Sequence, residues 1–304
     1  MEYLRIVNRT QLKQMMDERR DFVLIDVLLE EHYEQVHLPG AVNACVYNIG
    51  FLSQVDALVH DKDRLIVIYC NSSTSGAGDL ALQKLNGAGY TRVSIYKGGT
   101  VDWRRAGNAV EGVNPGYIYS PPRVEDRTYT IDPITTTMEW FGRNVMGSHH
   151  GTINILSGSI PIRRGVPVNA SFVIDMDSIV NLDLHDAGLN RMLVDHLKSD
   201  DFFDIKKFPT ARFDATVFKP VSGAKAGHPN YEVSGKLTMK GITNEISFLS
   251  VFSVRDDLAI TAEAHFDIDR TLWNVNYGSG KLFERLGRHL VYDIISLQLK
   301  LVAR

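Results

Sequence analysis

Cys70 and the polar loop after it are the part of this sequence best suited to chemistry. The loop consists of small hydroxyl, amide and glycine residues: Asn71, Ser72, Ser73, Thr74, Ser75 and Gly76. A cysteine can act as a thiolate nucleophile, and the backbone N–H groups of a short polar loop can hold an anion. We therefore predict a reactive cysteine with an anion-binding loop at residues 70–76.

The segments on either side predict how this loop is positioned. Residues 65–69 form an uninterrupted apolar run, which is typical of a buried parallel strand. Residues 77–85 have the apolar spacing of a helix. A thiolate is favoured where a helix begins, because free N–H groups and the positive end of the helix dipole meet there. The alternative is that Cys70 is only a small apolar residue at a strand end.

Length and composition exclude several classes of protein. A chain of 304 residues with a net charge of −3 is expected to form two domains. Its basic residues are scattered, so we expect no nucleic-acid partner. No apolar run approaches the roughly 20 residues that span a bilayer, and the first residues lack the apolar core of a signal peptide. We therefore expect a cytoplasmic protein without a transmembrane segment.

The first third of the chain alternates strand-like and helix-like segments. Residues 22–27, 65–70 and 93–96 read as buried strands, and Thr10 is a plausible N-cap for a helix over residues 11–19. This alternation predicts an α/β domain with a parallel sheet at residues 1–112. Residues 113–127, rich in proline and glycine and without periodicity, are predicted to be a linker.

Two-residue alternation dominates residues 128–304 and predicts an all-β antiparallel domain, either a sandwich or a closed barrel. One segment, residues 189–197, has leucines at helical spacing. The side chains expected to line the interior of a barrel are Phe172, Ile174, Met176, Phe213, Val217, Phe266, Leu297 and Leu299. Small residues on the same faces, such as Ala215 and Gly235, favour a ligand cavity over an interior filled by side chains.

Residues 3–112 resemble the rhodanese-like domain family. The matching pieces, in order, are Leu24-Ile25-Asp26-Val27, His37-Leu38-Pro39-Gly40-Ala41, Ile68-Tyr69-Cys70 with its loop, and Tyr96-Lys97-Gly98-Gly99 with Trp103. The resemblance implies that Cys70 accepts a sulfane sulfur as a persulfide and passes it to a thiol or to cyanide. Two positions depart from the family, which usually has arginine where this chain has Leu28 and Ser75.

These departures bear on the substrate. Without a cation between Cys70 and Gly76, the loop amides and hydroxyls would have to hold an anionic donor such as thiosulfate unaided. The missing arginine also argues against the phosphatase relatives, which bind a phosphoryl group through that side chain.

Residues 128–304 resemble the YceI-like family. Among the matching pieces are Tyr129-Thr130-Ile131-Asp132, Phe141-Gly142-Arg143-Asn144-Val145, Phe202-Phe203-Asp204, and Gly235-Lys236-Leu237-Thr238-Met239-Lys240-Gly241. The resemblance implies a lipocalin-like barrel that binds a polyisoprenoid, a quinone-like lipid or a similar long apolar ligand. It also implies a tendency to form homodimers.

Two functional hypotheses follow. In the first, the protein is a sulfurtransferase whose partners are a sulfur donor and a thiol acceptor, with a lipid in the barrel. In the second, it is a lipid-binding or carrier protein whose first domain is a non-catalytic sensor or docking module. Neither requires a cofactor. The histidines lack the spacing of a zinc site, so no metal site is predicted, and Cys45 is expected to be buried and inert.

Overall fold

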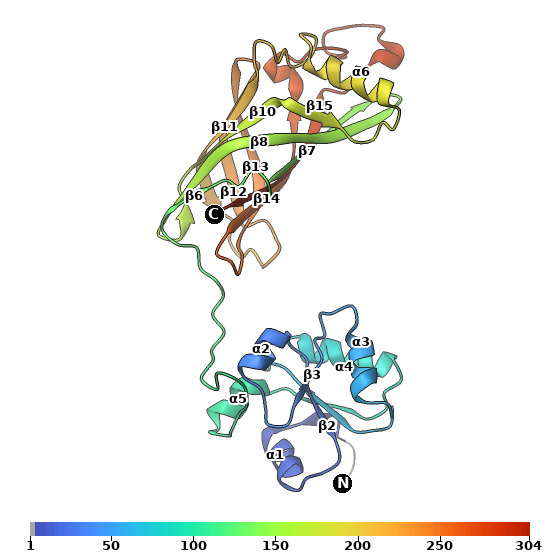
Figure 1. The fold of residues 1–304 in the computed structure, drawn as a ribbon, viewed down its shortest axis with the longest axis vertical. Helices are drawn as coiled ribbons and strands as arrows, with labels where there is room; N and C mark the ends of the chain where they lie inside the picture. Colours follow the sequence, from blue (N-terminus) through green and yellow to red (C-terminus); the bar gives the residue numbers. More distant parts are fainter. Residues whose placement is uncertain (1–3) are drawn as a thin grey trace. The chain divides into compact units, whose positions relative to one another are not determined.

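The computed structural model describes residues 4–304, which separate into two compact units. Residues up to Ser120 form the first unit, and Pro121–Arg304 form the second. In Figure 1 the colours of the first unit run from blue to cyan-green, and those of the second from green to red. Each unit has its own hydrophobic core.

The first unit alternates strands and helices. Its strands are β1 (Ile6–Val7), β2 (Val23–Asp26), β3 (Val42–Asn43), β4 (Ile66–Tyr69) and β5 (Val93–Tyr96). Its helices are α1 (Arg9–Asp17), α2 (Glu30–Gln35), α3 (Phe51–Leu58), α4 (Ala77–Gly87) and α5 (Gly99–Arg105). The strands pair in the order β1-β5-β4-β2-β3, and each of these pairings is parallel. The predicted parallel α/β domain is confirmed.

Helices cover both faces of this sheet (Figure 1). On one face, α3 and α4 pack over a cluster that contains Ile68, Cys70 and Ile95. On the other face, α1 and α5 pack over a cluster that contains Tyr69 and Tyr96. Successive strand residues thus point to opposite faces, as the geometry of a strand requires.

The N-cap of α1 differs from the prediction. Asn8, and not Thr10, caps the helix: its side chain accepts a hydrogen bond from the Gln11 N–H at 2.9 Å. The Gln11 side chain accepts one from the Asn8 N–H at 2.9 Å, which completes a capping box. The position of Gln11, three residues after the cap, therefore decides where the helix begins.

The second unit is built almost entirely from strands. They are β6 (Thr128–Thr130), β7 (Thr137–Asn144), β8 (Gly147–Arg163), β9 (Val166–Pro167), β10 (Ala170–Asn181), β11 (Thr210–Pro220), β12 (Tyr231–Met239), β13 (Ile242–Val254), β14 (Ile260–Asp269) and β15 (Ile294–Ala303). Between them lie α6 (Ala187–Lys198) and two single-turn 3₁₀ helices, η1 (Arg270–Trp273) and η2 (Gly287–His289).

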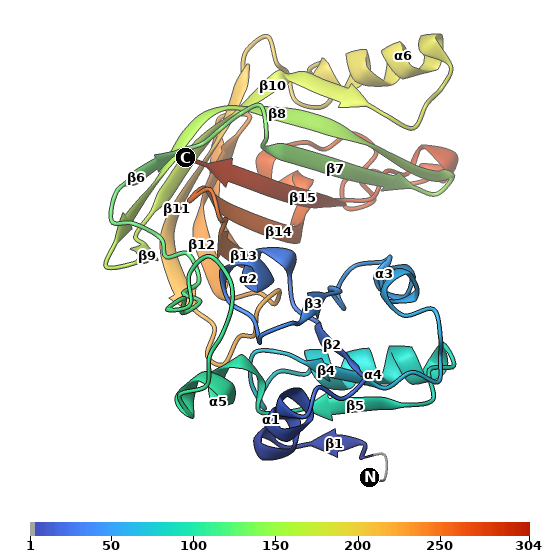
Figure 2. The same cartoon turned by 60° about the horizontal axis from the view of Figure 1, so that its bottom comes forward.

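Within residues 121–304, eight strands close into an antiparallel barrel (Figure 2). They follow the order β10-β11-β12-β13-β14-β15-β7-β8, and β8 pairs with β10 to complete the ring. The predicted antiparallel barrel is therefore confirmed. Closure pairs both edges of the sheet, so no long strand edge is left open.

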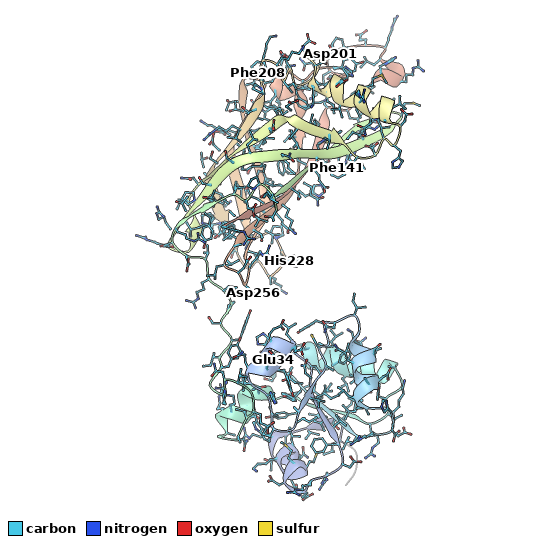
Figure 3. The ribbon with its side chains drawn as sticks, in the orientation of Figure 1. Glu34, Phe141, Asp201, Phe208, His228 and Asp256 are labelled. Carbon is cyan, nitrogen blue, oxygen red and sulfur yellow. The ribbon has the colours of Figure 1, made fainter. Side chains whose placement is uncertain are left out.

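The two ends of the barrel differ. Figure 3 shows Asp201 and Phe208 close to α6 at one end, and His228 and Asp256 at the opposite end. We call these the α6 end and the His228 end. Helix α6 is the next element after β10. Its N-cap is Asp186, whose carboxylate accepts hydrogen bonds from the N–H groups of Gly188 and Leu189.

The segment between the units is shorter than the predicted linker of residues 113–127. Val113 and Asn114 donate backbone hydrogen bonds to the carbonyls of Glu34 and Gln35, so they belong to the first unit. The Asp126 carboxylate accepts bonds from two backbone N–H groups of the β8–β9 turn, so it belongs to the second. Proline and glycine content alone did not reveal these contacts.

Residues 4–304 contain no helix with both the length and the apolar character needed to cross a lipid bilayer.

Candidate functional site

Cys70 lies between the end of β4 and the start of α4, where the sequence placed it. It is 2% exposed and belongs to the apolar cluster under α4. Its thiol donates a hydrogen bond to the Ser72 carbonyl at 3.5 Å, so the S–H group points back under its own loop. Within residues 4–304, the hydrogen bond of Cys70 Sγ is this one to a carbonyl, and none comes from the loop N–H groups that were predicted to surround a thiolate.

The loop over Cys70 is held by its own hydroxyl groups. The Ser72 and Thr74 hydroxyls are 3.0 Å apart, and the Ser75 N–H donates to the Ser72 carbonyl at 3.2 Å. The Ser75 hydroxyl accepts a bond from the Ala77 N–H at 3.3 Å, where α4 begins. Four of the loop residues are exposed: Asn71, Ser73, Thr74 and Gly76.

A glycine turn after β5 fixes the backbone of Cys70. The Thr100 N–H donates to the Cys70 carbonyl at 3.1 Å, and the Val101 N–H donates to the Asn71 carbonyl at 3.0 Å. Gly99 has a φ of +63°, and a Cβ atom there would lie 2.2 Å from the Cys70 carbonyl oxygen. Only glycine permits this approach. The turn therefore positions the loop from the neighbouring strand.

Two other positions from the sequence analysis, Leu28 and Cys45, lie in or against the apolar core of the first unit. Leu28, which stands where the related family has arginine, packs against the apolar cluster that contains Cys70. Cys45 is 2% exposed, and both cysteines are free thiols. Among residues 4–304, no group of three or more His, Cys, Asp or Glu side chains is arranged to hold a metal ion.

The barrel contains an apolar cavity of about 320 Å³ at the α6 end. Of the predicted lining residues, Ile174, Met176 and Leu297 face this cavity. Phe172, Phe213 and Leu299 instead line a separate cavity of about 40 Å³ that extends toward the His228 end. Phe266 lies inside the barrel and stacks on Phe248, with 4.2 Å between the ring centroids.

Val217 does not face the interior, so this prediction is wrong. Its side chain is 51% exposed. The pairing of β11 with β12 shifts register between Ala215 and Val217, which is a β-bulge. The extra residue reverses the alternation, so that Phe218 takes the inward position and lines the small cavity.

Several cavity residues were not found from the sequence. Leu193 and Leu197 of α6 line the cavity together with Phe202 and Phe203 from the segment after the helix. The leucine spacing of residues 189–197 was the available signal, but it did not show that α6 covers a barrel. Trp140 on β7 also lines the cavity, and its indole N–H donates to the Val180 carbonyl at 3.2 Å.

The polar groups of the cavity wall are basic or neutral. They include His149, whose Nδ1 lies 2.8 Å from Asp183 Oδ2. Burial acts to raise the pKa of Asp183, but hydrogen bonds from the His150 N–H, His149 and Asn181 outweigh it and lower that pKa to about 2. Asp183 therefore stays ionised and fixes the His149 ring at the cavity wall.

Comparisons with known proteins agree with both units. The YceI-like domain profile matches residues 129–303, and the rhodanese-like domain profile matches residues 8–106. The chain is 29% identical over 104 residues to a UPF0312 protein of Pseudomonas putida (strain GB-1), covering 34% of this chain and 49% of that protein. It therefore spans about half the length of such curated relatives.

Further similarities lie in each half. Over 97 residues the chain is 29% identical to the adenylyltransferase and sulfurtransferase uba4 of Ogataea parapolymorpha, covering 32% of this chain and 23% of that protein. The structure of Burkholderia cenocepacia BcnA is 24% identical with a TM-score of 0.45, covering 57% of this chain and 99% of its own. A polyisoprenoid binding domain from Saccharophagus degradans is 16% identical with a TM-score of 0.45, covering 58% and 97%.

Because its family profile covers more than half of the chain, the protein belongs to the YceI-like family, and it carries a rhodanese-like domain ahead of its YceI-like barrel.

Proposed function

We propose that the rhodanese-like domain is a sulfurtransferase with Cys70 as its nucleophile. The observation that carries the proposal is the position of Cys70, at a strand-to-helix loop that a glycine turn fixes from the next strand. The Cys70 thiolate attacks the outer sulfur of a donor such as thiosulfate. A sulfur–sulfur bond forms to Cys70, the donor's own sulfur–sulfur bond breaks, and sulfite leaves with the electron pair.

The second half of the cycle returns the enzyme to its starting state. An acceptor thiolate attacks the outer sulfur of the Cys70 persulfide, and the Cys70 thiolate leaves. Each step moves one sulfur atom between nucleophiles and balances without an electron carrier, so we propose that no cofactor is required. The loop of residues 71–76 must turn for this chemistry, because the thiol now lies beneath it.

Intact mass spectrometry tests the sulfurtransferase proposal. After incubation with thiosulfate or an inorganic polysulfide, the parent protein should gain the mass of one sulfur atom, and a thiol acceptor should remove it. Cys70→Ser should abolish the gain. Cys45→Ser is the matched control, since Cys45 is equally buried and should leave the gain unchanged. An unmodified parent, or an equal gain in Cys70→Ser, contradicts the proposal.

We also propose that the barrel binds a polyisoprenoid or a similar long apolar ligand. The apolar cavity of about 320 Å³ supports this, because leucine and phenylalanine side chains line it without filling it. Burying a hydrocarbon chain there contributes about 0.8 kcal/mol for each methylene group. A chain of moderate length therefore binds tightly without a polar anchor.

Filling the cavity should abolish this binding. Ala211 on β11 lies in the cavity wall and is 2% exposed, so Ala211→Trp places an indole in the space the ligand would occupy. Ala224→Trp adds the same side chain at an exposed position and is the control. Native mass spectrometry of freshly purified protein should show a long-chain ligand on the parent and on Ala224→Trp, and none on Ala211→Trp. An empty parent that takes up no such ligand argues against the proposal.

A non-catalytic role for the first domain is the second candidate. It is favoured by the burial of the Cys70 thiol and by the absence of lysine and arginine from residues 71–76. In that case the domain is a sensor or docking module for a lipid carrier. The mass experiment separates the two candidates, because a sensor that accepts no sulfur leaves the parent mass unchanged.

A further inference from the structure

An anionic sulfur donor at Cys70 needs a positive charge that the loop does not contain. Residues 71–76 include neither lysine nor arginine. Hydroxyl groups and backbone amides supply only partial charges, whereas thiosulfate is a dianion. The surroundings of the loop therefore decide whether such a donor can be held, and the question rests on the proposed sulfurtransferase function.

Lys97 and Cys70 directly follow two neighbouring strands of the sheet. Tyr69 of β4 pairs with Tyr96 of β5, and these are the last residues of the two strands, so Cys70 and Lys97 each begin a segment that leaves the same edge of the sheet. Strands of one sheet are about 4.8 Å apart. Tyr69 and Tyr96 point into the core under α1 and α5. Cys70 points to the opposite face, under α4, and the ion pair of Lys97 with Asp79 of α4 places the Lys97 ammonium on that side as well.

An ion pair holds the Lys97 ammonium at the start of α4. Its Nζ lies 3.0 Å from Asp79 Oδ1, and Asp79 belongs to the first turn of the helix. The preceding residue, Gly78, covers the thiol: a Cβ atom there would lie 3.7 Å from Cys70 Sγ. The ion pair therefore holds the ammonium beside the first turn of the helix that covers the sulfur.

The Lys97–Asp79 pair is easily broken. The two side chains are 44% and 60% exposed, and exposed pairs of this kind contribute at most about 1 kcal/mol. A lysine stem is long and flexible, so the ammonium can exchange the single charge of Asp79 for a doubly charged donor at the loop. Asp79 keeps the cation close to the site while no donor is bound.

We propose that Lys97 binds the anionic sulfur donor and replaces the cation missing from the loop. Its ammonium contacts the sulfonate oxygens of thiosulfate while the Cys70 thiolate attacks the outer sulfur. The same contact stabilises the sulfite that leaves with the electron pair. The site is thereby selective for small anionic donors over uncharged organic trisulfides, which gain nothing from the ammonium.

Single-turnover persulfidation of the full chain, followed by intact mass, tests the role of Lys97. With thiosulfate, Lys97→Met should raise the apparent KM about ten- to a hundred-fold, the usual effect of losing a charged hydrogen-bond partner. Lys97→Arg should restore most of the affinity. With an uncharged organic trisulfide, the Cys70 thiolate attacks the central sulfur, one thiolate leaves, and a mixed trisulfide remains on Cys70, which the intact mass also reports. Lys97→Met and the parent should form this adduct at the same rate. Lys13→Met is the matched control, because Lys13 forms a similar exposed pair with Asp17 on α1, over the other face of the sheet.

Asp79→Asn adds a test in the opposite direction. It releases the ammonium, so the KM for thiosulfate should fall, and this gain should vanish when Lys97→Met is added. The inference is overturned if Lys97→Met leaves the thiosulfate reaction unchanged, or if it slows both donors equally. A parent that accepts sulfur from neither donor refutes the proposed function itself and this inference with it, which is a distinct result.

Discussion

Replacing Arg270 by methionine is expected to lower the free energy of unfolding of the barrel by about 3–5 kcal/mol. Arg270 is 1% exposed, yet its guanidinium makes four hydrogen bonds to backbone carbonyls. These bonds go to Val275 at 2.5 Å, Tyr277 at 2.8 Å, Tyr292 at 3.1 Å and Val291 at 3.1 Å. Methionine keeps the apolar stem but leaves these carbonyls without their donor.

The same substitution should loosen the wall of the large cavity. Tyr277, Val291 and Tyr292 line that cavity, and Arg270 ties their backbone to the end of β14. The substitution also removes a counterion of Asp293, whose buried Oδ1 lies 3.6 Å from the guanidinium and has no hydrogen-bond partner within residues 4–304. Loss of Arg270 is therefore expected to reduce ligand retention as well as stability.

Urea unfolding followed by tryptophan fluorescence measures the effect on the barrel. A Trp103→Phe background leaves Trp140 and Trp273, which both lie in the second unit. Arg212→Met is the control, because Arg212 forms an exposed pair with Asp214 and its loss should cost less than about 1 kcal/mol. Equal stability of the Arg270 and Arg212 variants would show that the buried network is dispensable.

Most of the fold could be predicted because its signals are local. The apolar run before Cys70 reports one strand, and each alternating run after residue 128 reports another, through the side chains of that strand itself. The N-cap of α1 was not predicted correctly. Asn8 is the cap because of its reciprocal contact with Gln11, whereas by residue type Thr10 was equally suitable. Residue type alone does not separate such candidates.

The barrel lining was predicted less completely, since it depends on contacts between strands. A single bulge in β11 turned Val217 outward, and no residue in that strand marks it. Gly235 was expected to leave space for a ligand, but a Cβ atom there would lie 2.4 Å from the Asp214 carbonyl oxygen. This glycine serves the close approach of two strands. The cavity volume arises instead where α6 covers the barrel end.

At the site around Cys70, too, local features could be predicted and contacts between elements could not. The strand, the loop and the helix were visible in the sequence, whereas the direction of the thiol was not. Whether Cys70 Sγ meets amide N–H groups or the Ser72 carbonyl depends on loop torsions. Lys97 was part of the quoted family pattern, yet its place near Cys70 follows only from the aligned ends of β4 and β5 and from its ion pair with Asp79.

Replacing Asp26 by asparagine is expected to stabilise the first unit by about 3 kcal/mol above pH 7 and by little at pH 4. Burial raises the pKa of Asp26 from 3.8 to about 6, although the Leu28 N–H, the Tyr69 hydroxyl and the charge of His37 act against the rise. A difference of about two pKa units corresponds to about 3 kcal/mol. Below the lower value both states hold the proton. Between the two values only the folded state does, so stability falls as the pH rises.

Thiol labelling in urea measures this effect in the full chain, because Cys45 and Cys70 are both buried in the first unit. In a Cys70→Ser background, which removes the thiol that local turning of the loop could expose, a dithiopyridine reagent that reacts from pH 4 to pH 8 reports the urea midpoint of that unit through Cys45 alone. The midpoint of the parent should decline through pH 4–6 relative to Asp26→Asn, which keeps an acceptor for the Leu28 N–H at 3.0 Å. Asp17→Asn, at an exposed carboxylate of α1, should follow the parent at every pH. Parallel pH profiles for the parent and Asp26→Asn would show that the buried carboxyl carries no such penalty.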